Sequence, residues 1–234
     1  CQSMVAAVKL AGWNIRFLDV DYNNGMVEFE KYCSVISDKL DAILFVHLLG
    51  NYNFLGNLQK KCAESNVLLI EDSAQFYPPV SCLESEDLSQ VRLISFGSTK
   101  LVDADGGALI LSDDASLLSE INLFQKNFEF KDLPSIKNDL ALFNKKFYSL
   151  KSQLSSNINL HKSFQDILRF YLPAISLEIN FTDLLIKKIS EGVSQLPELI
   201  KIRQNNMKQY ENYLQDLPLK SLNASHSIPW RASF

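Results

Sequence analysis

Short, almost continuous apolar runs recur through the first half of the chain, and segments of helical length separate several of them. The strands expected from these runs are residues 15–20, 42–48, 67–70, 92–96 and 108–111. Such runs are typical of strands that are covered on both faces. Segments 55–64 and 115–124 have the length and apolar spacing of helices. This alternation predicts an α/β fold with a mostly parallel sheet flanked by helices.

The pattern changes after about residue 126, where charged and amide residues replace the strand-like runs. Apolar residues then recur at helical spacing from Leu177 to Leu196, which predicts one long amphipathic helix. Pro197 can open a second helix, which we expect to continue to Leu214. The domains expected are a large α/β domain over residues 1–126, a divergent helical connection over 127–176, and the start of a smaller C-terminal α+β domain over 177–234.

Composition argues against several classes of function. The chain has 234 residues, of which 47% are hydrophobic and 21% charged, and its formal net charge is -4. No basic surface is therefore expected for nucleic acid or an anionic membrane, and no apolar run approaches the length that spans a bilayer. The four cysteines form no CxxC pair, which indicates reduced thiols in a reducing compartment. The three histidines are scattered, so we expect no metal site.

Polar residues gather where the expected strands end. Ligands of open α/β sheets bind at the carboxyl ends of the strands. Here those ends carry Glu-Asp-Ser-Ala-Gln at residues 71–75 and Ser-Phe-Gly-Ser-Thr-Lys at residues 95–100. His47 follows another strand, where a structural histidine is an equally good interpretation. An acid, an amide, a hydroxyl and a lysine would therefore meet at one edge of the sheet.

These residue types are the ones that pyridoxal phosphate requires of a protein. Its aldehyde needs a lysine amine to form a Schiff base, its pyridine nitrogen needs a carboxylate, and its phosphate needs hydroxyl and backbone N–H groups. Lys100, Asp72 and Ser95 would fill those roles, with Gly97 allowing a tight turn before the lysine. Taken singly, the lysine would be a solvated surface group and the aspartate a helix cap or turn residue. Their combination favours a site.

The two motifs resemble the signatures of the DegT/DnrJ/StrS family of sugar aminotransferases, which use pyridoxal phosphate and have the aspartate aminotransferase fold. The family pattern is Glu-Asp-x-Ala-Gln/His after a buried strand, and later Ser-Phe-x-x-x-Lys before a glycine-rich strand start. This chain has EDSAQ and SFGSTKLVDADGGALILSDD at the corresponding places. GWNIRFLDVD and AILFVHLLGN also resemble family segments. The resemblance covers residues 3–127 well and residues 180–216 more loosely.

The resemblance implies a cytoplasmic homodimer that transfers an amino group from an amino acid, with glutamate as the expected donor, to a nucleotide-linked keto-sugar. Such reactions serve amino-sugar and cell-surface polysaccharide synthesis. Lys100 would bind the cofactor and move protons, Asp72 would pair with the ring nitrogen, and Ser95 would bind the phosphate. Gln75 would lie near the ring or its 3-hydroxyl, with hydrogen bonding inside the local turn as the alternative. A family member with histidine in place of the lysine is a sugar dehydratase, so Lys100 favours transamination.

Two alternatives stay open, namely sugar dehydration with the same cofactor and a degenerate relative that binds without catalysing. Residues 128–176 lack the family's Gly-Tyr-Asn-x-Arg stretch, and Glu178 and Asn180 fall where its Asn and Arg would lie. A glutamate there would repel the phosphate of a neighbouring subunit. The chain also begins without Met and ends in a strand-like segment, so we expect a piece of a longer protein that is cut at both ends.

Overall fold

The structure, a computed structural model, describes residues 2–21, 25–53, 55–77, 90–97, 99–104, 106–126, 183–218, 221–222 and 228–229, together with six single residues between 138 and 149. The chain divides into two compact units. One comprises Cys1–Phe17 and Phe124–Asn180, and the other Leu18–Leu123 and Phe181–Phe234. The first unit contains helix α1 (Gln2–Leu10), and the second contains the sheet and all four predicted site residues. The domain boundaries expected at residues 126 and 176 stay a prediction.

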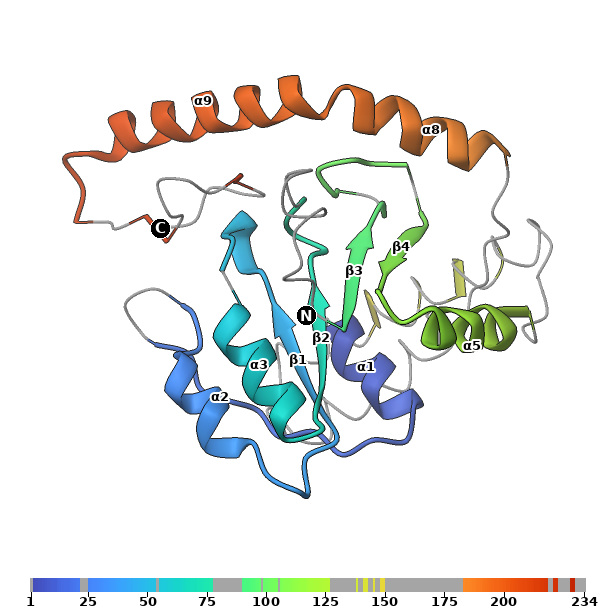
Figure 1. Cartoon of the computed structure of the whole chain (residues 1–234). Helices are drawn as coiled ribbons and strands as arrows, with labels where there is room; N and C mark the ends of the chain where they lie inside the picture. Colours follow the sequence, from blue (N-terminus) through green and yellow to red (C-terminus); the bar gives the residue numbers. More distant parts are fainter. Residues whose placement is uncertain are drawn as a thin grey trace. The chain divides into compact units, whose positions relative to one another are not determined.

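Four strands of the described part form one sheet (Figure 1). They are β1 (Ala42–Val46), β2 (Leu68–Asp72), β3 (Val91–Ser95) and β4 (Ala108–Leu111), in the spatial order β1-β2-β3-β4. Strands β1, β2 and β3 are parallel, and β4 runs antiparallel to β3. The predicted α/β class with a mostly parallel sheet is therefore confirmed. The carboxyl ends of β1, β2 and β3 lie at the same edge, where the loop from β3 to β4 also begins and ends.

Helices flank and follow this sheet. They are α2 (Phe29–Val35), the 3-10 turn η1 (Leu48–Gly50), α3 (Gly56–Glu64), α5 (Ala115–Lys126), α8 (Asp183–Ser194) and α9 (Leu196–Leu214). Helices α3, α5 and α9 lie close to where the sequence predicts them. Helix α8 corresponds to the later part of the long helix expected from Leu177 to Leu196. Residues 177–182 lie outside the described residues. Pro197 occupies the first turn of α9, as its fixed backbone angle allows.

The prediction of a strand at residues 15–20 is wrong. This segment has no regular secondary structure and is not a strand of the sheet formed by the described residues. Phe17 and Val20 are 68% and 49% exposed, and Leu18 is the residue of this segment that packs against the core. Helix α2 was not predicted, because seven residues are too few to show a recognisable helical pattern of apolar positions. It contributes Tyr32, which is buried.

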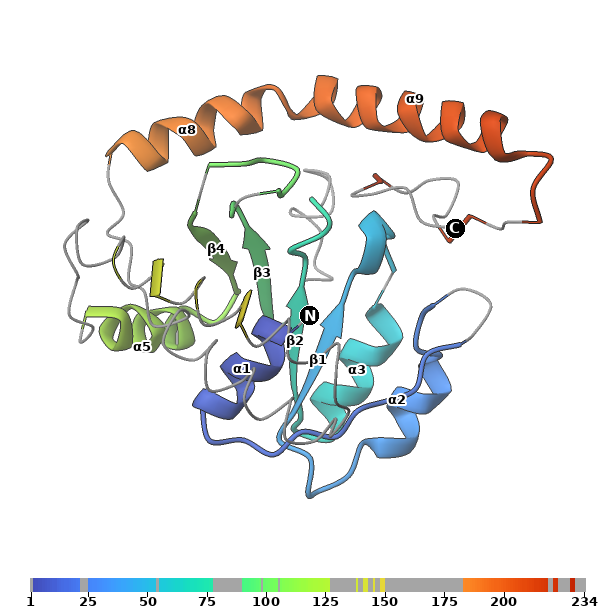
Figure 2. The ribbon, with the colours of Figure 1, turned by 180° about the vertical axis from the view of Figure 1, so that it is seen from behind.

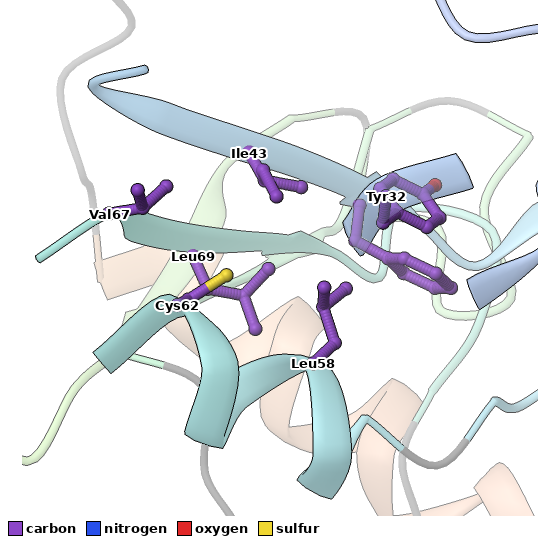
Figure 3. Close-up of a cluster of buried hydrophobic side chains, with 7 residues drawn as sticks. Tyr32, Ile43, Leu58, Cys62, Val67 and Leu69 are labelled. Atoms are coloured by element: carbon purple, nitrogen blue, oxygen red, sulfur yellow. The ribbon is translucent and has the colours of Figure 1, made fainter. Parts of the chain in front are cut away.

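One hydrophobic core lies between α2, α3 and the strands β1 and β2. Its buried residues are Tyr32, Ile43, Phe45, Leu58, Cys62, Val67 and Leu69. Figure 3 shows the side chains of Leu58 and Cys62 pointing from α3 toward the strands. The ring of Tyr32 lies 5.4 Å from that of Phe45, between centroids. Burial raises the pKa of Cys62 to about 11 and that of Tyr32 to about 12, so both groups stay neutral at pH 7.

The two faces of the sheet are buried unequally. Fully buried and half-buried residues alternate along β1, β2 and most of β3, so one face of these strands is fully buried and the other is half-buried. Residues paired between parallel strands share a face, and the face changes at each step along a strand. Asp72 pairs with Leu93, two positions before Ser95. Asp72 and Ser95 therefore belong to the less buried face, at its carboxyl edge.

A second core cluster joins the loop after β3 to α8 and α9. It contains Ile94, Phe96, Val102, Ala104, Leu185 and Leu196. Figures 1 and 2 show both helices running past the edge of the sheet to which β1, β2 and β3 point. Gly192 of α8 lies directly against Val102, because a Cβ atom at position 192 would be 2.6 Å from Val102 Cγ1. Ordinary carbon–carbon contact needs about 3.5–4.0 Å.

Gly192→Ala is expected to destabilise the protein although alanine favours helix formation. The gain in helix propensity is about 1 kcal/mol, whereas a methyl group forced into a packed contact costs about 1–3 kcal/mol. We expect the free energy of unfolding, measured by urea denaturation, to fall by about 1 kcal/mol. In a Val102→Ala background the space is open, and the same change should be neutral or stabilising. A stabilising effect in the unchanged background would show that the contact is not tight.

Candidate active site

The structure brings the four predicted site residues to one edge of the sheet. Asp72 is the last residue of β2, Ser95 is the last residue of the neighbouring strand β3, and Lys100 follows in the β3–β4 loop. Gln75 lies in the turn after β2. Asp72 is buried, and the other three are half-buried. This is the edge at which open α/β sheets bind ligands.

The side chain of Asp72 caps the turn that follows it. Its Oδ1 atom accepts a hydrogen bond of 2.8 Å from the backbone N–H of Ala74. Its main-chain oxygen accepts a bond of 3.0 Å from the N–H of His47, at the end of β1. A carboxylate accepts about four hydrogen bonds in all, so the bond from Ala74 leaves acceptor capacity at this side chain.

The loop that carries Lys100 folds back onto the end of β3. The Lys100 N–H donates to the Gly97 carbonyl at 3.1 Å, and the Gly97 N–H donates to Ser95 Oγ at 3.3 Å. The Phe96 carbonyl accepts bonds of 3.0 and 3.2 Å from the N–H groups of Ala104 and Gly106. The loop therefore begins and ends on the same residue of the sheet edge, which fixes the main chain on both sides of the lysine.

Thr99, directly before the lysine, has an unusual backbone conformation. Its φ angle is 73°, in the region that β-branched residues avoid, and such a residue costs about 1–3 kcal/mol. Its N–H donates to Asp103 Oδ2 at 2.9 Å, a bond that spans Lys100. Asp103 was not predicted as part of the site. Its only signal in the sequence is a short acidic residue in a turn-rich loop, which is too common to be specific.

Gln75 holds the turn after β1. Its Oε1 atom accepts a hydrogen bond of 2.9 Å from the N–H of Leu49, whose φ angle is 61°. This is not the bond within the local turn that the sequence suggested as an alternative, because Leu49 lies 26 residues earlier in the chain. The bond joins the turn after β2 to η1 after β1, and it uses the oxygen of the amide.

Three buried polar residues lie on the other face of the sheet, and we call His47, Glu71 and Arg92 the buried ionic cluster. Their exposed fractions are 0%, 1% and 2%. His47 Nε2 lies 2.5 Å from Glu71 Oε1, and Arg92 Nε lies 2.9 Å from Glu71 Oε2. From the sequence, a structural role was as good an interpretation of His47 as a site role, and no role was predicted for Glu71 or Arg92. The signal available in the sequence was a pair of opposite charges, one at the end of an apolar run and the other at the start of the next run.

Some expectations concern parts of the chain outside this description. Glu178 and Asn180, the positions aligned with the family's phosphate contact across subunits, lie outside the described residues. Within the described residues, no helix is long and apolar enough to cross a membrane.

The match of this sequence to a family agrees with the fold and with the placement of the motifs. Residues 2–232 match the DegT/DnrJ/EryC1/StrS aminotransferase family, and the chain belongs to this family. A curated relative, GDP-4-keto-6-deoxy-D-mannose 3-dehydratase of Escherichia coli, is 22% identical over 213 residues, which are 88% of this chain and 49% of the relative. The chain thus spans about half the length of that relative.

Solved structures support the fold. The Helicobacter pylori aminotransferase PseC, involved in the biosynthesis of pseudoaminic acid, superimposes with a TM-score of 0.64 at 15% identity, over 96% of this chain and 53% of its own. The E. coli 3-dehydratase with bound hydrated pyridoxal phosphate superimposes with a TM-score of 0.60 at 16% identity, over 96% of this chain and 54% of its own. Both likenesses show that this chain has the fold of these enzymes.

Asp103→Ala is expected to loosen the loop around Lys100. The variant removes the acceptor of the Thr99 N–H, a bond worth about 1 kcal/mol, while Thr99 keeps its strained conformation. Hydrogen exchange at the Thr99 amide should become about fivefold faster or more, as measured by NMR or mass spectrometry. Asp103→Asn keeps an acceptor oxygen and serves as the matched control. Equal exchange in the two variants would mean that this bond does not order the loop.

Proposed function

We propose that the chain forms the cofactor site of a pyridoxal-phosphate-dependent enzyme, with Asp72, Gln75, Ser95 and Lys100 as its binding residues. The main observation in support of the proposal is that these residues lie at the same edge of the sheet. Asp72 and Ser95 end adjacent parallel strands on the same face, and Lys100 follows in a loop hydrogen-bonded back to β3. Family membership supports the same cofactor.

The residues present fit the chemical demands of this cofactor. The Asp72 carboxylate has acceptor capacity beyond its bond from Ala74, as the protonated ring nitrogen requires. Ser95 Oγ accepts from the Gly97 N–H and keeps its own hydrogen to donate to a phosphate oxygen. Lys100 supplies a primary amine at a half-buried position. Gln75 fits least directly, because its oxygen is engaged with Leu49.

Each residue has a defined task in the proposed mechanism. Bound pyridoxal phosphate supplies an aldehyde and a ring that accepts electrons. Lys100 Nζ would hold the aldehyde covalently and would also be the group that carries protons during the reaction. Asp72 would hold the proton on the ring nitrogen, and Ser95 would bind the phosphate. Burial of Asp72 would strengthen its hydrogen bond to the ring nitrogen, because little water would compete.

The reaction proposed is amination of a nucleotide-linked keto-sugar with an amino acid, glutamate being the expected donor. Lys100 supports amination, because a sugar dehydratase of this family has histidine at the corresponding place. The dehydratase named above is a relative, so dehydration is the alternative reaction. Products separate the two, because amination gives an amino sugar and dehydration gives a deoxy keto-sugar.

The proposal includes a homodimer in the cytoplasm. Several large apolar side chains of the sheet-containing unit are exposed, which suits a further protein contact. They include Leu123, Leu184, Ile186, Tyr210 and Tyr213. Cys33 and Cys62 are free thiols, as a reducing compartment would keep them.

Lys100→Ala is expected to lower kcat by about a thousandfold or more, because it removes both the covalent link and the proton carrier. In the full-length protein, borohydride reduction with the cofactor bound should fix the label on Lys100, as mapped by mass spectrometry. The exposed Lys61, changed to alanine, is the matched control and should leave kcat and the label unchanged. A label on another lysine, or near-normal turnover of Lys100→Ala, would refute the assignment.

A further inference from the structure

The buried ionic cluster spans the three parallel strands next to the proposed cofactor site. Phe45 of β1, Glu71 of β2 and Arg92 of β3 are direct neighbours across the sheet, and His47 follows Phe45 by two positions on the same face. Its three members lie on the face opposite to Asp72. The cluster therefore lies behind the site and cannot touch a cofactor bound at Asp72.

The hydrogen bonds assign the proton of the His47 ring. The backbone N–H of Asn53 donates to Nδ1 at 3.3 Å, so Nδ1 is an acceptor and the ring proton is on Nε2. Nε2 then donates to Glu71 Oε1, while Glu71 Oε2 pairs with Arg92. Glu71 thus accepts the hydrogen bond from His47 and forms an ion pair with Arg92, whose charge it balances. A neutral histidine with an oriented ring completes the cluster.

A cluster of this kind is costly as a source of stability alone. Removing charges from water costs several kcal/mol per ion, and well-packed apolar residues often give equal or greater stability. What the charged groups add is geometry, because His47 and Arg92 are both held at short distances from the Glu71 carboxylate. Here those contacts fix the spacing between the ends of β1, β2 and β3.

The cluster has direct connections to the site. Glu71 precedes Asp72 in β2, so holding the Glu71 side chain on one face fixes the Asp72 side chain on the other. His47 binds both residues, with its ring on Glu71 and its N–H on the Asp72 carbonyl. Through Asn53, its ring also orders the segment after β1, in which Leu49 binds Gln75.

We propose that His47, Glu71 and Arg92 are positioning residues that set the orientation of Asp72 toward the cofactor's ring nitrogen. This inference rests on the proposed function, and it assigns a role to three residues that do not contact the cofactor. Loss of the cluster should weaken cofactor binding specifically through Asp72.

The test is a double-mutant cycle in the full-length protein, with pyridoxal phosphate affinity measured by absorbance titration of the apoprotein. Glu71→Gln keeps the shape of the side chain and removes its charge, and it should raise the Kd about tenfold or more, the scale seen when the outer hydrogen-bond partners of metal ligands are changed. In an Asp72→Asn background the same change should raise the Kd by less than about threefold, because the residue it positions is already impaired. Exposed Glu64→Gln is the control and should have no effect in either background.

Equal losses in the two backgrounds would overturn the inference, because a purely structural cluster would act independently of Asp72. Glu71→Gln binding as tightly as the Glu64→Gln control would overturn it as well. If Glu71→Gln fails to fold, Glu71→Gln combined with Arg92→Gln removes both charges together and leaves neither unpaired. This balanced variant should fold and bind about tenfold more weakly, and unchanged affinity would overturn the inference.

A different experimental result would show that the proposed function itself is wrong. An unchanged protein that is folded but binds no pyridoxal phosphate would refute the proposed function and this inference together. The proton position on His47 can be read without the cofactor, from NMR of the histidine ring nitrogens in the apoprotein. A proton on Nε2 is expected, and a proton on Nδ1 would overturn the hydrogen-bond scheme on which the inference depends.

Discussion

The register between β2 and its neighbours is the constraint on which the rest of the structure depends. Successive residues of a strand point to opposite faces, so Glu71 and Asp72 cannot share an environment. In the observed register Glu71 lies beside Arg92 in the buried face, and Asp72 reaches the less buried one. A slip of one residue would exchange them and would also turn Leu69, which is fully buried, out of the core. Burial of Leu69 therefore makes the slipped register costly, which keeps Asp72 on its own face at the sheet edge.

Much of the fold follows from local pattern, and the exceptions have physical reasons. Four of five expected strands form, because apolar runs of this length gain most by pairing inside a sheet. The fifth, residues 15–20, also contains apolar residues, and among the described residues it packs against the first core cluster through Leu18. A strand needs a neighbour with free hydrogen-bonding groups, and no local pattern shows whether one is present. Helix α2 is short and is stabilised by burying Tyr32, which again is a tertiary effect.

The residues of the candidate site also divide into those that the sequence could predict and those that it could not. Asp72, Ser95 and Lys100 could be proposed from the sequence because parallel strands bring their carboxyl ends together whatever the details of packing. The roles of His47 and Arg92 could not, because each depends on a contact with Glu71 that forms only in the folded sheet. Asp103 binds the nearby Thr99, but a short acidic residue in a turn-rich loop is too common to be a specific signal. The two sets are complementary. Topology decides which side chains reach the edge, and side-chain contacts behind and around them decide how well they are held.

The contact between Gly192 and Val102 has a consequence for biosynthesis. The lysine loop packs against a helix that lies far later in the chain, so a nascent chain that has released only the sheet cannot complete this packing. Val102 and Phe96 would stay without their helical partners until α8 leaves the ribosome. The order of synthesis thus separates two events, formation of the sheet edge and closure of the loop upon it. The edge can form early, whereas the surroundings of Lys100 are completed late in translation.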